Sequence, residues 1–233
     1  NAAICKMPLE RRKAVRTITR DLAETMTQIA TVCFPNAEQI DDRFHVQQLV
    51  SDALQEIRVV LRKDAIKEHN RKVSDARKRN GRYFAPRYEN GDTLKELLAR
   101  AKYVLYKPVG RWAKSQKERA AILFREFPRL EDAYNLTMHF RGIYEHAKNP
   151  GDGRLRLRRW YESVVRRLDV FPNFETPMQT IQLHEDTIVN YFNDRRTNAS
   201  AESFNAKIKN FRGLQRGVSN VSFFLYRLAK LYG

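Results

Sequence analysis

Hydrophobic residues recur at helical spacing through most of the chain, and they predict a helical middle. The longest such pattern begins at Val46, and its apolar positions share one face of a helix: Leu49, Val50, Ala53, Leu54, Ile57, Val60 and Leu61. Similar patterns predict further helices over residues 93–106, 115–127, 130–146, 155–168, 178–192 and 221–231. The run Asn149-Pro150-Gly151-Asp152-Gly153 predicts a loop, and Gly213 predicts a break before the last helix.

The first forty residues follow a different pattern. Residues 13–20 are rich in β-branched side chains and predict a strand that ends next to Asp21. A helix should follow from Leu22 to Cys33, because Pro35 prevents its continuation. Residues 38–42 predict a second strand, which closes on Asp42. This strand–helix–strand order is typical of βαβ units, whose sites lie at the carboxyl ends of the strands.

A third segment, residues 195–212, predicts a helix with two distinct faces. Phe204, Ile208 and Phe211 form an apolar stripe, whereas Glu202 lies on a polar face of its own. A carboxylate in the first turn of a helix is favoured by the helix dipole and stays ionised. It could serve as an oxygen ligand for Mg²⁺. A solvated glutamate on an exposed face is the alternative, and it is the commoner case for a single glutamate.

The charge balance points to a polyanionic partner. The chain has 233 residues, with 44 Lys and Arg against 27 Asp and Glu, a net charge of +17 and a pI of about 10.1. Nucleic acid is the simplest such partner. The very basic section 62–87 fits either a solvated helix end and loop or a DNA-contacting surface. No apolar run is long enough to predict a membrane span.

The two cysteines favour a reducing, cytoplasmic setting. Cys5 and Cys33 belong to no metal-ligand or disulfide pattern.

Three carboxylates stand out as candidate chemistry. Asp21 and Asp42 close the two predicted strands, and Glu202 opens a helix far downstream. Carboxylates in such an arrangement can bind two Mg²⁺ ions for in-line phosphoryl transfer. Spacing alone is weak support, because strands that end on aspartate are common.

Two motifs carry a resemblance to a known family. Phe34-Pro35-Asn36-Ala37 followed by Asp41-Asp42-Arg43-Phe44-His45-Val46, together with residues 197–209, resembles the signature of the ISL3-type DDE transposases. The resemblance implies an α/β RNase H-like core, incomplete in this chain, with a large all-α insertion, so that the fold is predominantly helical. On that basis residues 1–62 form part of the core, residues 63–175 the basic helical insertion, and residues 176–233 the C-terminal helices that complete the core.

The same resemblance implies cut-and-paste DNA transposition, in which metal-dependent strand cleavage and transfer depend on two aspartates and a glutamate. It makes Glu202 the final glutamate and Asp21 the second aspartate, with Asp42 as a competing candidate and all three as ligands of Mg²⁺ or Mn²⁺. The first aspartate should lie upstream, so we interpret the chain as the C-terminal part of such an enzyme.

Basic side chains near these positions are candidate DNA contacts: Arg43, Arg154, Arg156, Arg158, Arg159, Lys207, Lys209, Arg212 and Arg216. The resemblance also implies self-association and a cytoplasmic, nucleoid-associated protein. The alternative hypothesis is a non-catalytic, basic helical nucleic-acid-binding protein, a decayed transposase remnant.

Overall fold

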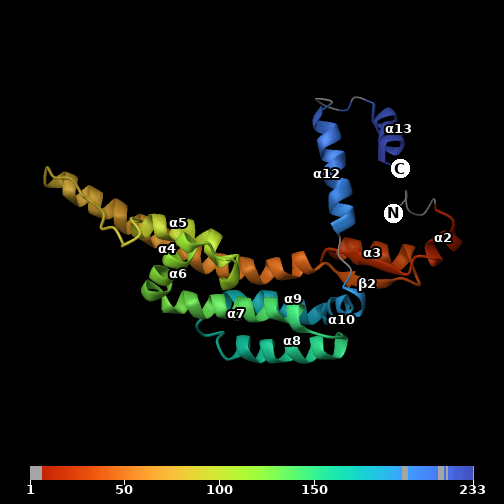
Figure 1. The fold of residues 1–233 in the computed structure, drawn as a ribbon, viewed down its shortest axis with the longest axis horizontal. Coiled ribbons are helices and arrows are strands. Elements are labelled where there is room, and N and C mark those ends of the chain that lie inside the picture. The colour runs from red at the N-terminus through yellow and green to blue at the C-terminus, as the bar shows by residue number, and fades with distance from the viewer. Residues whose placement is uncertain (1–6, 196–198, 215–217, 219, 233) are drawn as a thin grey trace.

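The computed structural model describes residues 7–195, 199–214, 218 and 220–232, and this part of the chain is predominantly helical, as predicted. Figure 1 shows an elongated body of helices, from one end of which the last two helices stand off. The first part of the chain comprises α2 (Leu9–Lys13), β1 (Thr17–Arg20), α3 (Glu24–Cys33), β2 (Glu38–Asp41), α4 (Arg43–Lys78), α5 (Leu94–Leu105), η1 (Val109–Arg111), α6 (Lys114–Glu126) and α7 (Pro128–His146). It continues with α8 (Pro150–Val165), η2 (Pro172–Phe174), α9 (Glu175–Leu183), α10 (Glu185–Val189), α11 (Tyr191–Asp194), α12 (Ala199–Leu214) and α13 (Val221–Tyr232).

The strand–helix–strand prediction is confirmed. β1 and β2 lie side by side and parallel, with α3 as the crossover, and the register pairs Arg20 with Asp41. The first strand is shorter than predicted, because Lys13 ends the short helix α2 and only the run from Thr17 is extended. Both strands therefore end at the same edge of the sheet, and the polar residues that follow them are brought together there.

Helix α4 is the longest element and forms the axis of the body. Its 36 residues correspond to a length of about 54 Å at 1.5 Å per residue. Only its first half is buried, where Val46, Val50 and Leu54 pack against α5 and α7. Its second half continues as a solvated helix as far as Lys78 and projects beyond its neighbours (Figure 1). The basic section is thus helical over most of its length, with the loop confined to its end.

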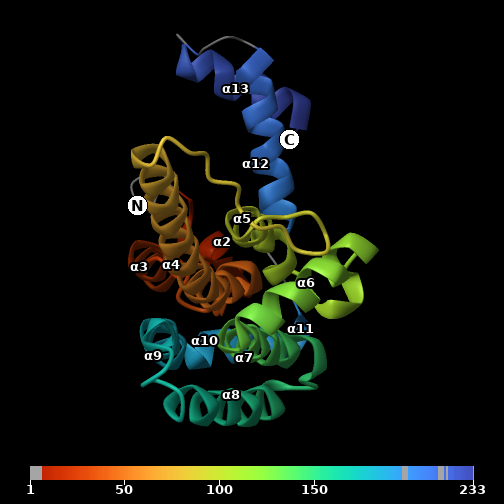
Figure 2. The same cartoon turned by 90° about the vertical axis from the view of Figure 1, so that its left-hand side faces the viewer.

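The largest core joins α4 and α5 to the layer formed by α7, α8 and α9, as Figure 2 shows end-on. Trp160 is fully buried in it, and its Nε1 donates to the Leu136 carbonyl at 3.0 Å. Phe140 contacts the Trp160 ring at a centroid distance of 4.7 Å. These aromatic side chains therefore pack the interior.

The prediction of a loop at residues 149–153 is wrong, because α8 begins there. The Asn149 side chain accepts a hydrogen bond from the Asp152 amide at 2.9 Å, and Pro150 occupies the first helical position. Asparagine as an N-cap followed by proline is a favourable helix start. Gly153 lies inside the helix, where a Cβ atom would stand 2.5 Å from the Phe192 ring. Gly153, which suggested a loop, instead allows α8 and α11 to approach closely.

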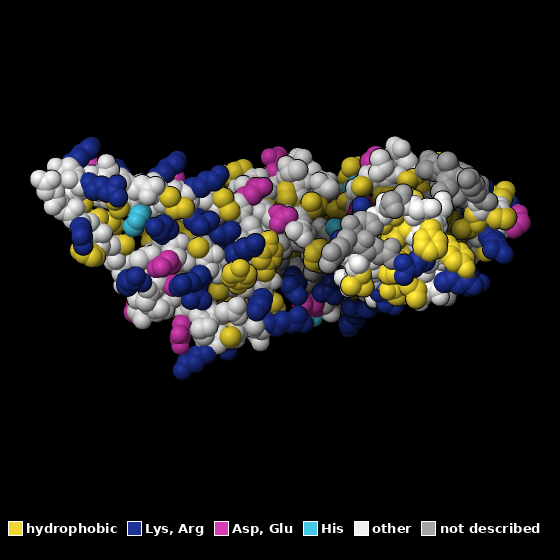
Figure 3. All heavy atoms as spheres, turned by 90° about the horizontal axis from the view of Figure 1, so that it is seen from above, with side chains coloured by type: hydrophobic (Ala, Val, Ile, Leu, Met, Phe, Trp, Pro, Cys, Tyr) yellow, Lys and Arg dark blue, Asp and Glu magenta, His cyan; other side chains and the backbone are white. Residues whose placement is uncertain are grey.

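The predicted break at Gly213 is also displaced, because α12 continues to Leu214. Helices α12 and α13 form a hairpin with its own small core, in which Phe211 stacks on Phe224 at a centroid distance of 5.4 Å. Figure 3 shows hydrophobic side chains gathered on the outside of this hairpin, where Phe223 and Tyr226 are exposed. The hairpin core is separate from the main core.

The close approach of α8 and α11 can be tested with Gly153→Ala. The added methyl group must displace the Phe192 ring, and we expect the free energy of unfolding to fall by about 1–3 kcal/mol. Gly142→Ala in α7 is the matched control, since its Cβ would meet nothing nearer than the His146 ring at 3.7 Å. Alanine there should be neutral or stabilising by up to about 1 kcal/mol. Equal urea unfolding midpoints for the two variants would contradict the packing described.

Candidate active site

The carboxyl edge of the two-stranded sheet brings three aspartates together. Asp41 is the last residue of β2, Asp42 follows it, and Asp21 follows β1. The Asp42 amide donates to the Arg20 carbonyl at 2.7 Å, which continues the parallel ladder by one residue. Asp21, Asp41 and Asp42 thus lie at the same edge of the sheet, and their catalytic role stays a prediction.

Asp41 points into the protein and is fully buried. Its Oδ1 lies 2.8 Å from Arg20 Nη1, as an ion pair without the alignment of a hydrogen bond. Its Oδ2 accepts a hydrogen bond from the Thr187 hydroxyl and lies 3.6 Å from His184 Nδ1. Burial raises the pKa of Asp41, and the Thr187 hydrogen bond and the Arg20 charge oppose that rise. Both oxygens are thus engaged in joining β2 to β1 and to the α9–α10 segment.

Asp42 caps the long helix. Its Oδ1 accepts from the Phe44 amide at 2.7 Å, and the residue is only 3% exposed. Aspartate is among the best N-cap residues, and its charge is favourable at the helix N-terminus. Asp42 therefore has a structural role in starting α4, whatever else it does.

Asp21 is the more accessible of these carboxylates. It is half-buried, and its Oδ1 accepts from the Ala23 amide at 3.2 Å, just before α3 begins. It lies close enough to Asp41 for its negative charge to contribute to the raised pKa of Asp41. Asp21 thus presents a carboxylate at the edge of the sheet, beside a buried acid that Arg20 already compensates.

Tyr144 from α7 closes the inner side of this edge. The residue is completely buried, and its hydroxyl has no hydrogen-bond partner among the described residues. Burial raises the pKa of Tyr144 well above its ordinary value, and the Asp41 charge adds to the rise. The Arg43 guanidinium lies 5.5 Å from the centre of its ring. The tyrosine is therefore a neutral hydroxyl near the aspartates.

The chain leading to α12 is anchored on α7 at Arg195, four residues before the helix begins. Arg195 has a left-handed backbone conformation (φ 53°), and its guanidinium donates to the carbonyls of Tyr144 at 3.1 Å and Ala147 at 2.6 Å. Four residues later α12 begins, and Figure 1 shows it standing off from the body of helices. Glu202 lies in the first turn of this helix, and its side chain is outside the described part of the structure. Its approach to Asp21 stays a prediction.

The candidate DNA contacts fall into two groups. Arg154 donates to Glu185 and Asp186 at 2.9 Å each and so ties α8 to α10, and Arg156 pairs with Asp152 at 3.0 Å. In contrast, Arg158 and Arg159 are exposed and form no ion pair with a described residue.

The remaining candidate DNA contacts lie on α4, on α12 and after α12. Arg43 is half-buried, 3.9 Å from Glu145. Lys207, Lys209 and Arg212 are exposed along α12, with Lys207 5.7 Å from the centre of the Tyr232 ring. Arg216 lies outside the described residues.

Several residues that hold the site were missed by the sequence analysis: Arg20, Tyr144, His184, Thr187 and Arg195. Only Arg20 carried a signal, since a charged residue at the end of a buried strand requires a partner. The described residues do not include the Glu202 side chain. Among them, no group of three or more His, Cys, Asp or Glu could hold a metal ion. No described helix is long and apolar enough to cross a membrane.

The comparisons with known proteins agree with this picture at the level of the family. A family model described as a transposase, of the ISL3 type of DDE transposases, matches residues 2–228, which is nearly the whole chain. The chain therefore belongs to the ISL3-type transposase family. No curated protein and no solved structure matches it.

The buried ion pair at this edge can be tested by a double-mutant cycle. Arg20→Met leaves the Asp41 charge uncompensated in the interior, so we expect it to lower the free energy of unfolding by about 3–5 kcal/mol. Adding Asp41→Asn should recover part of that loss, because the uncompensated charge is gone. The control is Arg125 and Glu89, an exposed pair at 2.9 Å, for which the same cycle should give a far smaller coupling because solvent screens the two charges. Strict additivity at Arg20 and Asp41 would contradict the interpretation.

Proposed function

We propose that this chain carries part of the catalytic centre of a DDE transposase, which cleaves and joins DNA strands with the help of divalent metal ions. The observation that carries the proposal is the parallel strand–helix–strand unit, whose carboxyl edge holds the half-buried Asp21. Family membership supplies the reaction class. In this proposal the strands belong to an RNase H-like core, and the helices between β2 and α12 form an insertion.

Asp21 is our choice for the second aspartate of the DDE set. Its side chain is half-exposed and has one hydrogen bond to a backbone amide, whereas Asp42 is buried and caps α4. A ligand for a metal that also meets DNA must be reachable from solvent. Asp42 then serves to fix the start of α4, and Asp41 serves to hold the two strands together through Arg20.

The residues present fit a hard divalent cation. Carboxylate oxygens are the ligands that Mg²⁺ prefers, and Mn²⁺ takes the same donors. Arg20 pairs with Asp41, and the Asp21 carboxylate lies beside that pair at the same edge. When bound, such ions activate the attacking oxygen and stabilise the leaving one. The protein's own part is to hold Asp21 and Glu202 in place, while exposed Lys207, Lys209 and Arg212 on α12 hold the neighbouring phosphates.

Substitution of the proposed ligands in the full-length protein tests the assignment. Asp21→Asn and Glu202→Gln keep side-chain size but remove the anionic oxygen, so Mg²⁺-dependent cleavage of a terminal-repeat oligonucleotide should fall by at least about 100-fold. DNA binding should persist in both variants, because other residues carry it. Asp64→Asn, at an exposed carboxylate of α4, is the control and should cleave normally.

Asp42→Asn separates the two candidate aspartates. Asparagine caps a helix as well as aspartate does, so this variant should keep the fold, and under our assignment it should retain cleavage. Loss of cleavage in Asp42→Asn together with normal cleavage in Asp21→Asn would reverse the assignment. Normal cleavage in Glu202→Gln would favour the alternative of a non-catalytic DNA-binding protein.

The two groups of arginines on α8 predict different effects on DNA binding. Arg158 and Arg159 are free to meet phosphates, and replacing both with Gln should reduce the slope of log K against log salt by about 1.8, since each phosphate contact contributes about 0.9. Arg154→Gln should leave that slope unchanged and lower the unfolding midpoint, because it removes the link to Glu185 and Asp186. The opposite pattern would indicate that the Arg154 face of α8, and not the face with Arg158 and Arg159, contacts DNA.

A further inference from the structure

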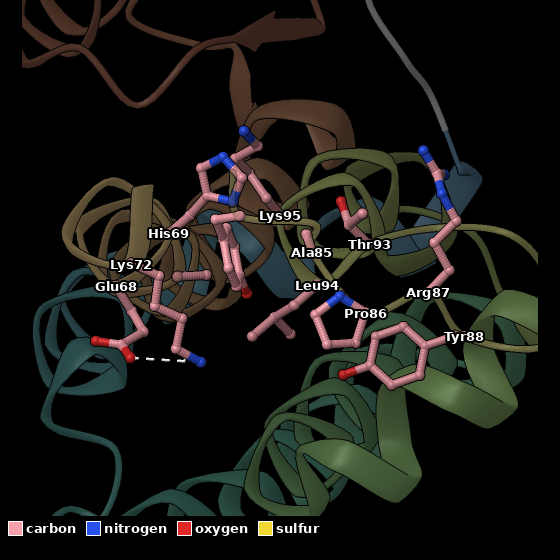
Figure 4. A pocket seen from close by; sticks show the side chains of 12 residues that line it. Glu68, His69, Lys72, Ala85, Pro86, Arg87, Tyr88, Thr93, Leu94 and Lys95 are labelled. Carbon is pink, nitrogen blue, oxygen red and sulfur yellow. Dashed lines mark ion pairs between the residues drawn. The ribbon is translucent and has the colours of Figure 1, made fainter. Parts of the chain in front are cut away.

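A pocket remote from the sheet edge lies between the second half of α4 and the segment that leads to α5. Its volume is about 220 Å³, below the ~300–1,000 Å³ usual for small-molecule pockets, so it has room for one planar group and a small polar one. Figure 4 shows the side chains that line it: His69 and Lys72 come from α4, Pro86 and Tyr88 from the connecting segment, and Leu94 and Lys95 from α5. Tyr83 also lines the pocket.

The walls of the pocket are aromatic and apolar. The Tyr83 ring meets the His69 ring edge-on at a centroid distance of 5.5 Å. Lys72 Nζ lies 5.9 Å from the centre of the Tyr83 ring. Tyr88 is fixed by its hydroxyl, which donates to Glu126 at 3.2 Å. Leu94 lies between these two sides in Figure 4. A flat, apolar face of a ligand would be held here by ring contacts.

The charge in the pocket is positive. Lys95 is half-buried and forms no ion pair with any described residue. The one acid in the lining, Glu68, is already shared by Arg71 at 2.7 Å and Lys72 at 3.5 Å. The Lys95 ammonium group is therefore available to bind an anionic group. Further exposed arginines lie beyond the pocket, around the end of α4: Arg77, Arg79 and Arg82.

The rim of the pocket is rigid before any ligand arrives. Asp92 is fully buried and pairs with Arg100 and with Arg119, the latter at 2.8 Å. Its carbonyl accepts from the Tyr88 amide at 2.9 Å, and Thr93 begins α5 with a capping box. The segment from 87 to 93 is thus held to α5 and α6, which keeps Tyr88 in place. A preorganised wall loses little freedom when a ligand binds.

We propose that this pocket binds one unpaired nucleotide of a DNA strand, with the base against Tyr83 and Tyr88 and the phosphate at Lys95. The combination of ring faces and an unpaired cation suits a nucleotide, and bases stack on aromatic side chains regardless of sequence. A paired base is covered by its neighbours in the duplex, so the pocket accepts a base only where the strand is single. This proposal rests on the proposed function for the identity of the polyanion.

The test compares the 233-residue chain bound to a blunt duplex and to the same duplex with a three-nucleotide overhang, by fluorescence anisotropy without divalent metal. The overhang should bind about tenfold more tightly, in line with stacking of one base. 2-Aminopurine in the overhang should be quenched on binding. Tyr83→Ala and Lys95→Gln should reduce the advantage to less than about twofold, and Tyr83→Phe should retain it because the ring remains.

Matched controls lie next to the tested residues. Phe84 adjoins Tyr83 but is 81% exposed and does not line the pocket, and Lys102 is an exposed lysine of the same helix as Lys95. Phe84→Ala and Lys102→Gln should keep the overhang advantage. Equal binding of blunt and overhang DNA by the unaltered chain would overturn the pocket proposal alone, whereas absence of any DNA binding would overturn the proposed function as well. A free deoxynucleoside monophosphate that binds as tightly as the overhang would assign the pocket to a soluble nucleotide instead.

Discussion

The buried ion pair between Arg20 and Asp41 is the interaction on which the arrangement of the candidate site depends. A two-stranded parallel sheet has little stability of its own, and this pair joins the ends of its two strands. Asp41 also receives the Thr187 hydroxyl, and Asn190 donates to the Gln39 carbonyl at 3.0 Å. The α10 segment thereby covers the open side of β2, so the sheet edge is held by residues from the far end of the chain.

A long helical segment with a shared core separates the sequence segments that carry the candidate carboxylates. The main core fixes α7 against α4, and Arg195 then attaches the chain to the last carbonyls of α7. The helices from α4 to α11 share this core and so form one packed unit.

Much of the fold was predictable from the sequence because the signals were local. Hydrophobic periodicity located most of the helices, and β-branched residues located the strands. Prediction failed where a residue type common in turns serves helix packing instead. Gly153 is the example, because its lack of a side chain lets α8 pack against Phe192. The candidate aspartates were also local signals, since strand ends are visible in sequence. The roles of these aspartates could not be predicted, because Asp41, Asp42 and Asp21 differ only in their tertiary surroundings. Those surroundings include Thr187, Tyr144 and Arg195, which are distant in sequence.

The separate core of the α12–α13 hairpin has a consequence for cooperativity. Among its described side chains only Phe211, Phe224 and Leu228 are buried in it, and none of them belongs to the main core. Units with few buried contacts open at lower free energy than the protein as a whole. The amide hydrogens of α12 and α13 should therefore exchange with solvent faster than those in α7. The change from slow to fast exchange should fall at the first turn of α12. Part of the candidate site would then be supplied by an element that can detach while the aspartate edge remains folded.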